Sequence, residues 1–308
     1  MTTMYVATIG GHISELVELA ERIPPDDEIW VTHDTPQTRD LLAGRRVVTV
    51  PVIDERDLLG VIKAIPQARR LLVGHEVDRV VSTGSAIALA YLPVAAALGI
   101  EAHYIESSTR VTSRSKTGAL LARLPRIHRW WQFDAPPERF RHLGGVFDRF
   151  HPVDGPEPLA LQKIVVTVGT TPRDFRRLVE RLVEIVPPSA EVLWQTGQSD
   201  VSDLPIEART LVPERELVAA IEAADVVVSH AGSGSLALAL RAGKVPVFVP
   251  RRAEFDEQID DHQVELALWA SRNGLAVTAE AGSVSADHLE TAARRTVRTA
   301  PVGELVLT

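Results

Sequence analysis

The sequence of 308 residues contains no cysteine, and this absence removes several chemistries at once. Without a thiol, the chain can form no disulfide and no thiolate metal site, and it has no cysteine nucleophile. Such a composition suits a reducing compartment, where disulfides are rare. Acidic residues outnumber basic ones and give a net charge of −8, so no nucleic-acid partner is expected.

Long apolar runs are missing too. The longest, residues 86–100, is shorter than the roughly 20 residues that a membrane-spanning helix needs, and it contains Pro93. The first five residues lack the basic and apolar regions of a signal peptide. We therefore expect a cytoplasmic protein whose membrane contact, where it occurs, is peripheral, at the inner face of the cell membrane.

Two nucleotide-binding fingerprints and one metal-binding pattern are also absent. Gly10-Gly11-His12 does not fit G-x-G-x-x-G, and the pattern G-x-x-x-x-G-K-[ST] does not occur. These absences disfavour dinucleotide-dependent hydride transfer and P-loop hydrolysis. There is no D-x-D pair of acidic residues, so we expect no metal site.

What the sequence does contain is an alternation of short apolar runs with segments of helical period. Residues 5–9 have the pattern of a strand, and Ile13 and Leu16 then begin an apolar face with helical spacing. The same pattern restarts at residues 164–168. This alternation predicts an α/β fold with parallel sheets.

A stretch with few aliphatic side chains divides the two halves. Residues 147–158 contain three prolines and a glycine, which is typical of a linker. We therefore predict an N-terminal domain over 1–150 and a C-terminal domain over 159–308. Both are expected to be Rossmann-like and to face each other across a cleft.

Four glycine-bearing loops follow predicted strands. Glycine lets a ligand approach the backbone, and the helix that follows presents free N–H groups to a phosphate. Each loop is also what any strand-to-helix turn of this fold needs, so none is diagnostic alone. The loops are Gly10-Gly11-His12, Ser82-Thr83-Gly84-Ser85, Gly169-Thr170-Thr171 and Gly232-Ser233-Gly234-Ser235.

Taken together, these motifs resemble those of GT-B glycosyltransferases. The segment from His230 to Gln263, with Trp194-Gln195-Thr196-Gly197 before it, is similar to the donor-binding half of the peptidoglycan and dolichol-linked GlcNAc transferases. The first half, with Gly10-Gly11-His12 and Glu106, resembles the partner subunit of the dolichol enzyme, so the chain looks like a fusion of the two subunits. The stretch from Val249 to Gln263 is closer to bacterial exopolysaccharide glycosyltransferases.

The resemblance implies an inverting, metal-independent transfer from a UDP-sugar to a hydroxyl group. The acceptor would be a lipid-linked saccharide of surface polysaccharide synthesis or a small molecule, and no cofactor besides the donor is implied. The N-terminal domain would bind the acceptor and the C-terminal domain the donor. One position departs from the family, because Leu238 replaces a glutamate that holds the donor ribose in the peptidoglycan enzyme. Glu257 or backbone groups are the open replacements.

Two residues are candidates for the base that accepts the hydroxyl proton. His12 ends the first loop, and its pKa lies near the working pH. The alternative role for His12 is to cap the helix or to contact a phosphate. Glu106 is the second candidate, and its alternative role is an ion pair with Arg110.

The donor side includes the phosphate loops and several side chains nearby. Arg251 would hold the leaving diphosphate, and Asp261 and Gln263 would contact sugar hydroxyls. Gln263 has an alternative role at the start of the next helix, and Asp261 has one in orienting His262. The predicted donor residues are Gly169, Thr170, Thr171, Gly197, His230, Gly232, Ser233, Gly234, Ser235, Arg251, Asp261 and Gln263.

Residues 107–133 carry six basic side chains and no acidic one. Leu120, Leu124, Ile127 and Trp131 add an apolar stripe at helical spacing, which favours contact with an anionic membrane or a lipid acceptor. The alternative is a solvated basic face. The predicted acceptor and membrane residues are Gly11, Gly84, Ser85, Arg110, Arg114, Arg123, Arg126, Trp130 and Trp131.

Two rival functions stay open at this level. A sugar-nucleotide epimerase would use the same fold with acidic residues beside the donor sugar. A non-catalytic protein would bind a sugar nucleotide without turnover, or would act as a scaffold that binds the membrane and recruits a partner glycosyltransferase to it. The sequence leaves monomer and homodimer equally open.

Overall fold

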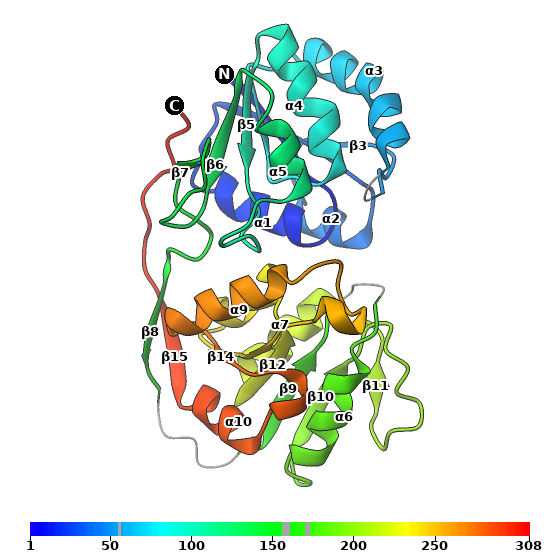
Figure 1. The fold of residues 1–308 in the computed structure, drawn as a ribbon, viewed down its shortest axis with the longest axis vertical. Coiled ribbons are helices and arrows are strands. Elements are labelled where there is room, and N and C mark those ends of the chain that lie inside the picture. The colour runs from blue at the N-terminus through cyan, green and yellow to red at the C-terminus, as the bar shows by residue number, and fades with distance from the viewer. Residues whose placement is uncertain (55–56, 156–160, 170–172) are drawn as a thin grey trace. The chain divides into compact units, whose positions relative to one another are not determined.

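A computed structural model describes residues 1–54, 57–155, 161–169 and 173–308 (Figure 1). The chain divides into two compact units, residues 1–146 with 302–308 and residues 147–301. The last residues therefore belong to the first unit, whereas the sequence analysis assigned them to the second domain. Among the described residues, none of the helices combines the length and the apolar character required to cross a bilayer.

The first unit is built on a seven-stranded sheet with the order β3-β2-β1-β4-β5-β6-β7. All neighbouring strands are parallel, as the alternation of apolar runs and helices predicts. The chain reverses direction across the sheet between β1 and β4, where ligands of such folds bind. The strands are β1 (Thr2–Val6), β2 (Asp27–Thr32), β3 (Val47–Thr49), β4 (Arg79–Ser82), β5 (Glu101–Ile105), β6 (Ile127–Trp131) and β7 (Arg141–His142).

Five helices connect these strands. The helix α4 is mostly buried except at its last turn and ends at Gly99, whose φ of 78° gives the left-handed cap that the sequence predicts. The helix α3 packs on α4, and α5 packs on the other side of α4. The helices are α1 (Gly11–Ala20), α2 (Pro36–Leu41), α3 (Leu58–Gly74), α4 (Ala86–Leu98) and α5 (Lys116–Leu121).

The second unit has a six-stranded parallel sheet with the order β11-β10-β9-β12-β13-β14. Its strands are β9 (Lys163–Thr167), β10 (Glu191–Gln195), β11 (Ala208–Arg209), β12 (Val226–His230), β13 (Val247–Val249) and β14 (Val277–Thr278). Its helices are α6 (Arg176–Ile185), α7 (Glu214–Ala223), α8 (Ser233–Arg241), α9 (His262–Arg272) and α10 (Ala286–Ala293), with short turns η1 (Ala253–Phe255) and η2 (Ala281–Ser283). Each half thus has its own Rossmann-like sheet.

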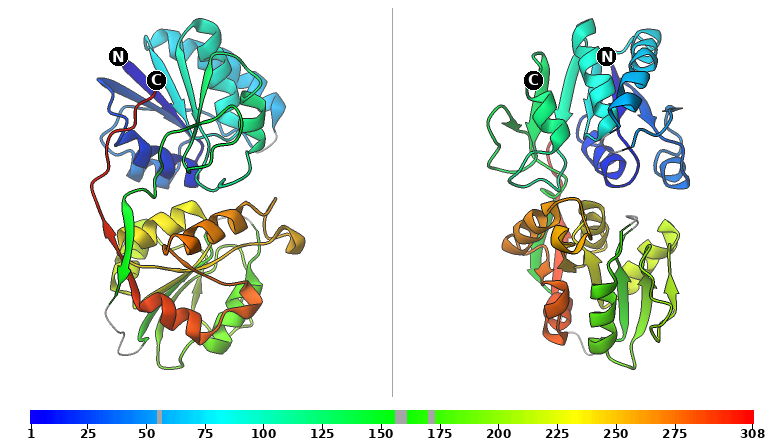
Figure 2. Two further views of the ribbon diagram at one scale, coloured as in Figure 1. Left: turned by 60° about the vertical axis from the view of Figure 1, so that its left-hand side comes forward. Right: turned by 45° about the vertical axis from the view of Figure 1, so that its right-hand side comes forward.

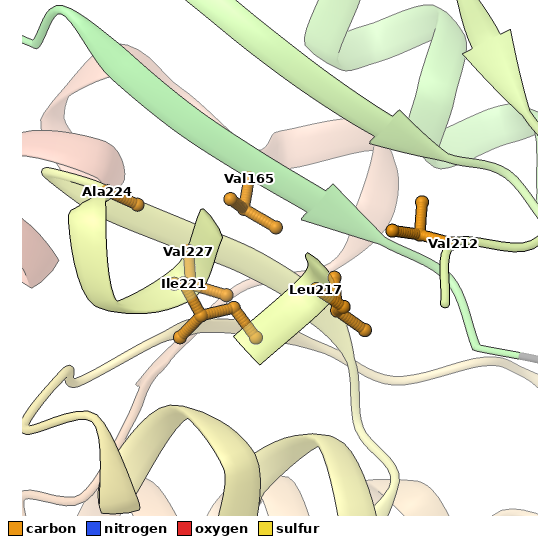
Figure 3. Close-up of a cluster of buried hydrophobic side chains, with 6 residues drawn as sticks. All are labelled: Val165, Val212, Leu217, Ile221, Ala224 and Val227. Carbon is orange, nitrogen blue, oxygen red and sulfur yellow. The ribbon is translucent and has the colours of Figure 1, made fainter. Parts of the chain in front are cut away.

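One core of the second unit lies beneath α7. Val165 and Val227 of the central strands pack against Leu217 and Ile221 of α7 (Figure 3). Leu238 of α8 packs against the same cluster. These side chains recur at the spacing of a buried strand or of one helix face, so local pattern and packing agree.

Part of the predicted linker forms a strand instead of a loop. Residues Phe150–Asp154 form β8, which pairs antiparallel with β15 (Arg295–Thr299). Figure 2 shows the two strands side by side in both views. Pro152 of β8 is compatible with an edge strand, because such a strand needs fewer N–H donors.

Candidate active site

Three loops of the second unit meet beside His230, and two of them contact its imidazole. A Cβ atom on Gly169 would lie 2.4 Å from His230 Cε1, and one on Gly232 would lie 2.5 Å from His230 Nε2. A Cβ on Gly197 would lie 2.8 Å from the carbonyl oxygen of Gly169. No side chain fits at these distances, so the three glycines allow the loops after β9, β10 and β12 to meet at one edge of the sheet.

His230 is buried at the end of β12, and its ring carries no charge near neutral pH. Burial lowers the pKa of His230 to about 3, and the positive charge of Arg251 adds to this effect. The hydroxyl of Ser235 lies 3.4 Å from Nδ1 of the ring. A neutral imidazole can exchange hydrogen bonds with a ligand, but it cannot supply positive potential.

The first turn of α8 is the polar element at this edge. Gly232 is the N-cap, and the first hydrogen bond of the helix runs from Leu236 N to the carbonyl of Gly232. The N–H groups of the preceding residues therefore have no acceptor within the helix. Gly234 faces open space, since a Cβ there would meet no atom within 4 Å. This geometry suits an anionic group such as a diphosphate.

The prediction that Arg251 faces the diphosphate is wrong. Its side chain is 0% exposed. Nη1 donates to the carbonyl oxygens of Arg173 and Asp174 at 3.0 and 2.7 Å, and Nη2 donates to that of Val168 at 2.8 Å. The guanidinium therefore anchors both ends of the loop after β9.

Thr170 and Thr171 lie outside the described residues, so their predicted donor contacts remain untested. The helix that follows begins at Arg176 with Phe175 at its N-cap. The ring of Phe175 lies 4.7 Å below the guanidinium carbon of Arg251, which gives the arginine an apolar support as well.

Gln263 and Asp261 both contact backbone of the second unit. The Oε1 atom of the buried Gln263 accepts a hydrogen bond from Arg251 N at 3.0 Å. Asp261 Oδ1 accepts one from Ala253 N at 3.1 Å. Both side chains thus brace the segment between β13 and α9, and contacts with a sugar remain a prediction for each.

Neither the position of the missing glutamate nor Glu257 offers a free carboxylate for the ribose. Leu238 packs against the apolar cluster beneath α7. Glu257 is buried and forms a two-point ion pair with Arg177, with distances of 3.1 and 3.0 Å. It also accepts a hydrogen bond from Arg252 N. Recognition of the ribose by Glu257 or by backbone groups stays a prediction.

In the first unit, His12 and Gly84 lie together at the carboxyl edge of the sheet. His12 is in the first turn of α1, which follows β1, and Thr83 Oγ1 donates to its carbonyl oxygen at 2.9 Å. A Cβ on Gly84 would lie 3.5 Å from His12 Cε1. Ser85 caps α4 with a φ of 65°, a strained value for a residue with a side chain. The glycine loops after β1 and β4 thus form one surface, with Gly11 exposed beside His12.

Glu106 is buried below that surface. It accepts hydrogen bonds from Tyr104 Oη at 2.7 Å and from Ser115 N at 3.2 Å. Burial raises the pKa of Glu106, which these hydrogen bonds and the charge of Arg110 partly offset. A Cβ on Gly118 would overlap the carboxylate, so α5 covers this side of Glu106.

Glu15 is a second buried carboxylate, which the sequence analysis did not place in the site. It accepts hydrogen bonds from Ser108 N at 2.8 Å, from Ser107 Oγ at 3.0 Å and from Gln132 Nε2. Burial raises the pKa of Glu15 to about 7. The available signal was a carboxylate on the apolar face of α1, one turn after His12. Glu15 ties the loops after β5 and β6 to α1.

The predicted membrane stripe is wrong in part. Trp130 and Trp131 belong to β6 and are 3% and 0% exposed. Trp130 Nε1 donates to His103 Nδ1 at 3.1 Å, and Trp131 packs edge-on against Phe140. Both tryptophans are therefore core residues. The side chains of Arg114, Arg123 and Arg126 are exposed, and Arg110 is partly exposed.

Within the described part of the chain, no group of three or more His, Asp or Glu side chains has the arrangement of a metal site.

Comparisons with known proteins identify the kind of enzyme. Residues 163–294 match the model of the glycosyltransferase family 28 C-terminal domain. Two relatives bear the name UDP-N-acetylglucosamine–N-acetylmuramyl-(pentapeptide) pyrophosphoryl-undecaprenol N-acetylglucosamine transferase. The one from Parasynechococcus marenigrum is 26% identical, over 90% of this chain and 83% of its own length. The one from Verminephrobacter eiseniae is 27% identical, over 42% of this chain and only 36% of its own length.

Solved structures share the fold at low sequence identity. MurG of Acinetobacter baumannii is 19% identical with a TM-score of 0.62, over 94% of this chain and 89% of that one. The glycosyltransferase SnogD of Streptomyces nogalater is 20% identical with a TM-score of 0.64, over 95% and 91%. The spinosyn rhamnosyltransferase SpnG, solved with thymidine diphosphate, is 12% identical with a TM-score of 0.58, over 95% and 90%. The chain is thus a glycosyltransferase of the GT-B fold, similar to the peptidoglycan GlcNAc transferase.

Proposed function

We propose that this glycosyltransferase moves a sugar from a UDP-sugar to a hydroxyl of a lipid-linked saccharide, with inversion and without a metal ion, in surface polysaccharide synthesis. The names of the two relatives include UDP-N-acetylglucosamine and a pyrophosphoryl-undecaprenol acceptor. The observation that carries the proposal is the convergence of the glycine loops and the first turn of α8 on His230.

The donor diphosphate would bind at the N-terminus of α8. The free N–H groups of that turn and the hydroxyls of Ser233 and Ser235 can donate to phosphate oxygens. Because His230 is neutral, the positive potential would come from the helix end. That potential stabilises the diphosphate as it leaves with the electron pair of the broken bond.

The acceptor would bind at the carboxyl edge of the first sheet. Its hydroxyl oxygen attacks the anomeric carbon from the face opposite the diphosphate, which inverts that centre. His12 takes the hydroxyl proton, because it lies at this edge and is only partly buried. Glu106 is buried under α5 with two hydrogen-bond donors already on it, so we assign it to supporting this edge.

An anionic membrane surface would be the third partner, and the helix α3 offers the face for it. Leu58, Leu59 and Ile62 are 64%, 69% and 60% exposed. Lys63, Arg69 and Arg70 are exposed on the same helix, and residues 58–75 contain no acidic residue. Exposed leucines with basic side chains are typical of a helix that lies in the membrane interface. Because α3 follows β3, it begins at the edge where His12 lies.

Calorimetric titration tests the donor site. Purified protein with EDTA is titrated with UDP, GDP, dTDP and AMP. Selective binding of UDP without metal is the expected result. Binding of dTDP alone would replace UDP as the donor nucleotide. No binding of any nucleotide would overturn the donor-site assignment and favour the scaffold.

Donor turnover separates transfer from epimerisation. A transferase consumes UDP-sugar only when acceptor is present, whereas an epimerase converts it without acceptor. UDP release that depends on an undecaprenyl-linked saccharide is the expected result. Conversion of the sugar in the absence of acceptor would establish the epimerase.

A further inference from the structure

A strongly basic cavity of about 390 Å³ lies in the first unit, where β6 begins and the chain approaches β7. Four of its seven lining residues are arginines and one is a histidine, and none is acidic. The five are Arg126, Arg129, Arg139, Arg141 and His128. Because β6 starts here, the cavity is at the amino end of that strand. It is separate from the carboxyl edge that carries His12.

Main-chain carbonyls hold two of the guanidinium groups in place. Arg129 Nε donates to the carbonyl of Arg139 at 2.9 Å, and its Nη1 donates to that of Leu124 at 3.2 Å. Arg139 Nη1 donates to the carbonyl of Ala122 at 3.3 Å. These acceptors fix the positions of the two side chains without neutralising their charges.

Arg141 is positioned by an aromatic ring. Its guanidinium carbon lies 4.4 Å above the ring of the buried Trp130. Nη2 donates to the main-chain oxygen of Thr308 at 2.5 Å and lies 3.1 Å from His128 Nδ1. Arg126 is exposed and has a φ of 63°. The four cations therefore come from separate points of the backbone to a single cavity.

The positive charge of this group is poorly balanced. Within the described residues the four arginines form one side-chain ion pair, in which Arg139 Nε lies 3.8 Å from the largely exposed Glu138. Arg141 also donates to the main-chain oxygen of Thr308, the last residue, so the charges of Arg126 and Arg129 are the least balanced. Burial and the charges of Arg139 and Arg141 lower the pKa of the Arg129 guanidinium. Mutual repulsion of this kind is relieved when an anion binds among the charges.

We propose that this cavity is a binding site for a phosphate group. A guanidinium group can donate two parallel hydrogen bonds to the oxygens of a phosphate. Several guanidinium groups around one cavity therefore suit a tetrahedral, doubly charged oxyanion. The phosphate has two sources, the headgroup of an anionic phospholipid and a soluble phosphorylated molecule. Because the cavity is separate from the donor and acceptor edges, this site does not depend on the proposed reaction.

Titration with pyrophosphate tests the soluble source. Saturating UDP is present throughout, so that the donor site is filled, and the salt concentration is held constant. Arg126→Ala combined with Arg141→Ala should weaken pyrophosphate binding at least about tenfold. Arg215→Ala is the matched control, because Arg215 is an exposed arginine of the second unit and lies outside the cavity.

Sedimentation with vesicles tests the lipid source. Vesicles of phosphatidylglycerol should bind the wild type and the control more strongly than the double variant, whereas vesicles of phosphatidylcholine should show no difference. If the double variant loses only pyrophosphate binding, the ligand of the cavity is a soluble phosphorylated molecule. If it loses only vesicle binding, the ligand is a lipid headgroup. Unchanged binding in both assays overturns the site.

If the double alanine variant does not fold, two single variants that preserve the fold replace it in both assays. Arg126→Glu reverses an exposed charge, and Arg141→Lys retains the charge but loses the fork. Both should bind phosphate more weakly than the wild type at an unchanged unfolding temperature. Wild-type affinity in both would overturn the proposal.

Discussion

His12 lies beside Gly84, in the first turn of α1, where an acceptor hydroxyl would approach. A general base contributes to the rate of transfer and little to donor binding. We predict that His12→Ala lowers kcat by a factor of about 10²–10⁴ and leaves the UDP affinity unchanged. Steady-state kinetics and calorimetry measure the two quantities. His142→Ala, an exposed histidine on β7, is the control, and near-normal kcat in His12→Ala would remove His12 as the base.

Gly232 and Gly234 differ in the space around them although only one residue separates them. A Cβ on Gly232 would press on the His230 ring, whereas Gly234 faces open space. We predict that Gly232→Ala lowers the free energy of unfolding by about 1–3 kcal/mol. Gly234→Ala should leave it unchanged or raise it, because alanine favours a helix. Denaturant unfolding measures both variants, and equal stabilities would contradict the crowding at His230.

Glu15 gives the first unit a dependence on pH. Its pKa is raised to about 7 from an ordinary value of 4.5, so folding favours the protonated form. The contribution of protonated Glu15 to the free energy of unfolding is fully present below pH 4.5 and is lost as the pH rises through 7. We predict that the wild type loses up to about 3 kcal/mol across this window relative to Glu15→Gln. Unfolding curves at several pH values measure the difference, and parallel pH profiles would rule it out.

At the scale of the element, Arg251 organises the loop after β9. Its guanidinium donates hydrogen bonds to backbone carbonyls on both sides of residues 170–172. The backbone N–H of Arg251 in turn donates to the side chain of Gln263 in α9. We predict that Arg251→Met destabilises the protein by about 3–5 kcal/mol, since three carbonyls lose their buried donor. Unfolding measurements check this value. Arg252→Ala, at the next and partly exposed position, should cost far less, and a similar loss in both variants would contradict the anchor.

Local pattern predicted the strand-to-helix loops, because a buried strand followed by glycine and a helix face is a property of adjacent residues. It could not predict the role of Arg251, whose carbonyl partners lie 77 to 83 positions earlier in the chain. Trp131 falls in phase with Leu120 and Leu124 as if on a helix. Pairing of β6 with β5 overrides that phase and buries the ring. Long-range strand pairing likewise turned part of the expected linker into β8.

At the scale of the whole molecule, α3 is the surface that we propose for contact with the membrane that carries a lipid-linked acceptor. The buried residues Val61, Ala68 and Leu72 attach it to its unit, so its exposed leucines are not needed for folding. We predict that replacing Leu58, Leu59 and Ile62 with serine lowers binding to phosphatidylglycerol vesicles about tenfold or more at unchanged thermal stability. Vesicle sedimentation measures the binding. The control replaces the exposed Leu211 of the second unit, and undiminished binding of the triple variant would exclude α3.

The return of the chain to the first unit has a consequence for synthesis on the ribosome. Leu305 and Leu307 are buried there, and Leu305 N donates to the carbonyl of Arg22. The second unit is a single continuous segment whose ends meet in the β8–β15 pair, so topologically it is an insertion within the first. It can fold while the rest of the protein is still being made. The first unit begins to be translated before the second but is completed after it, because residues 302–308, which close it, leave the exit tunnel after the whole second unit.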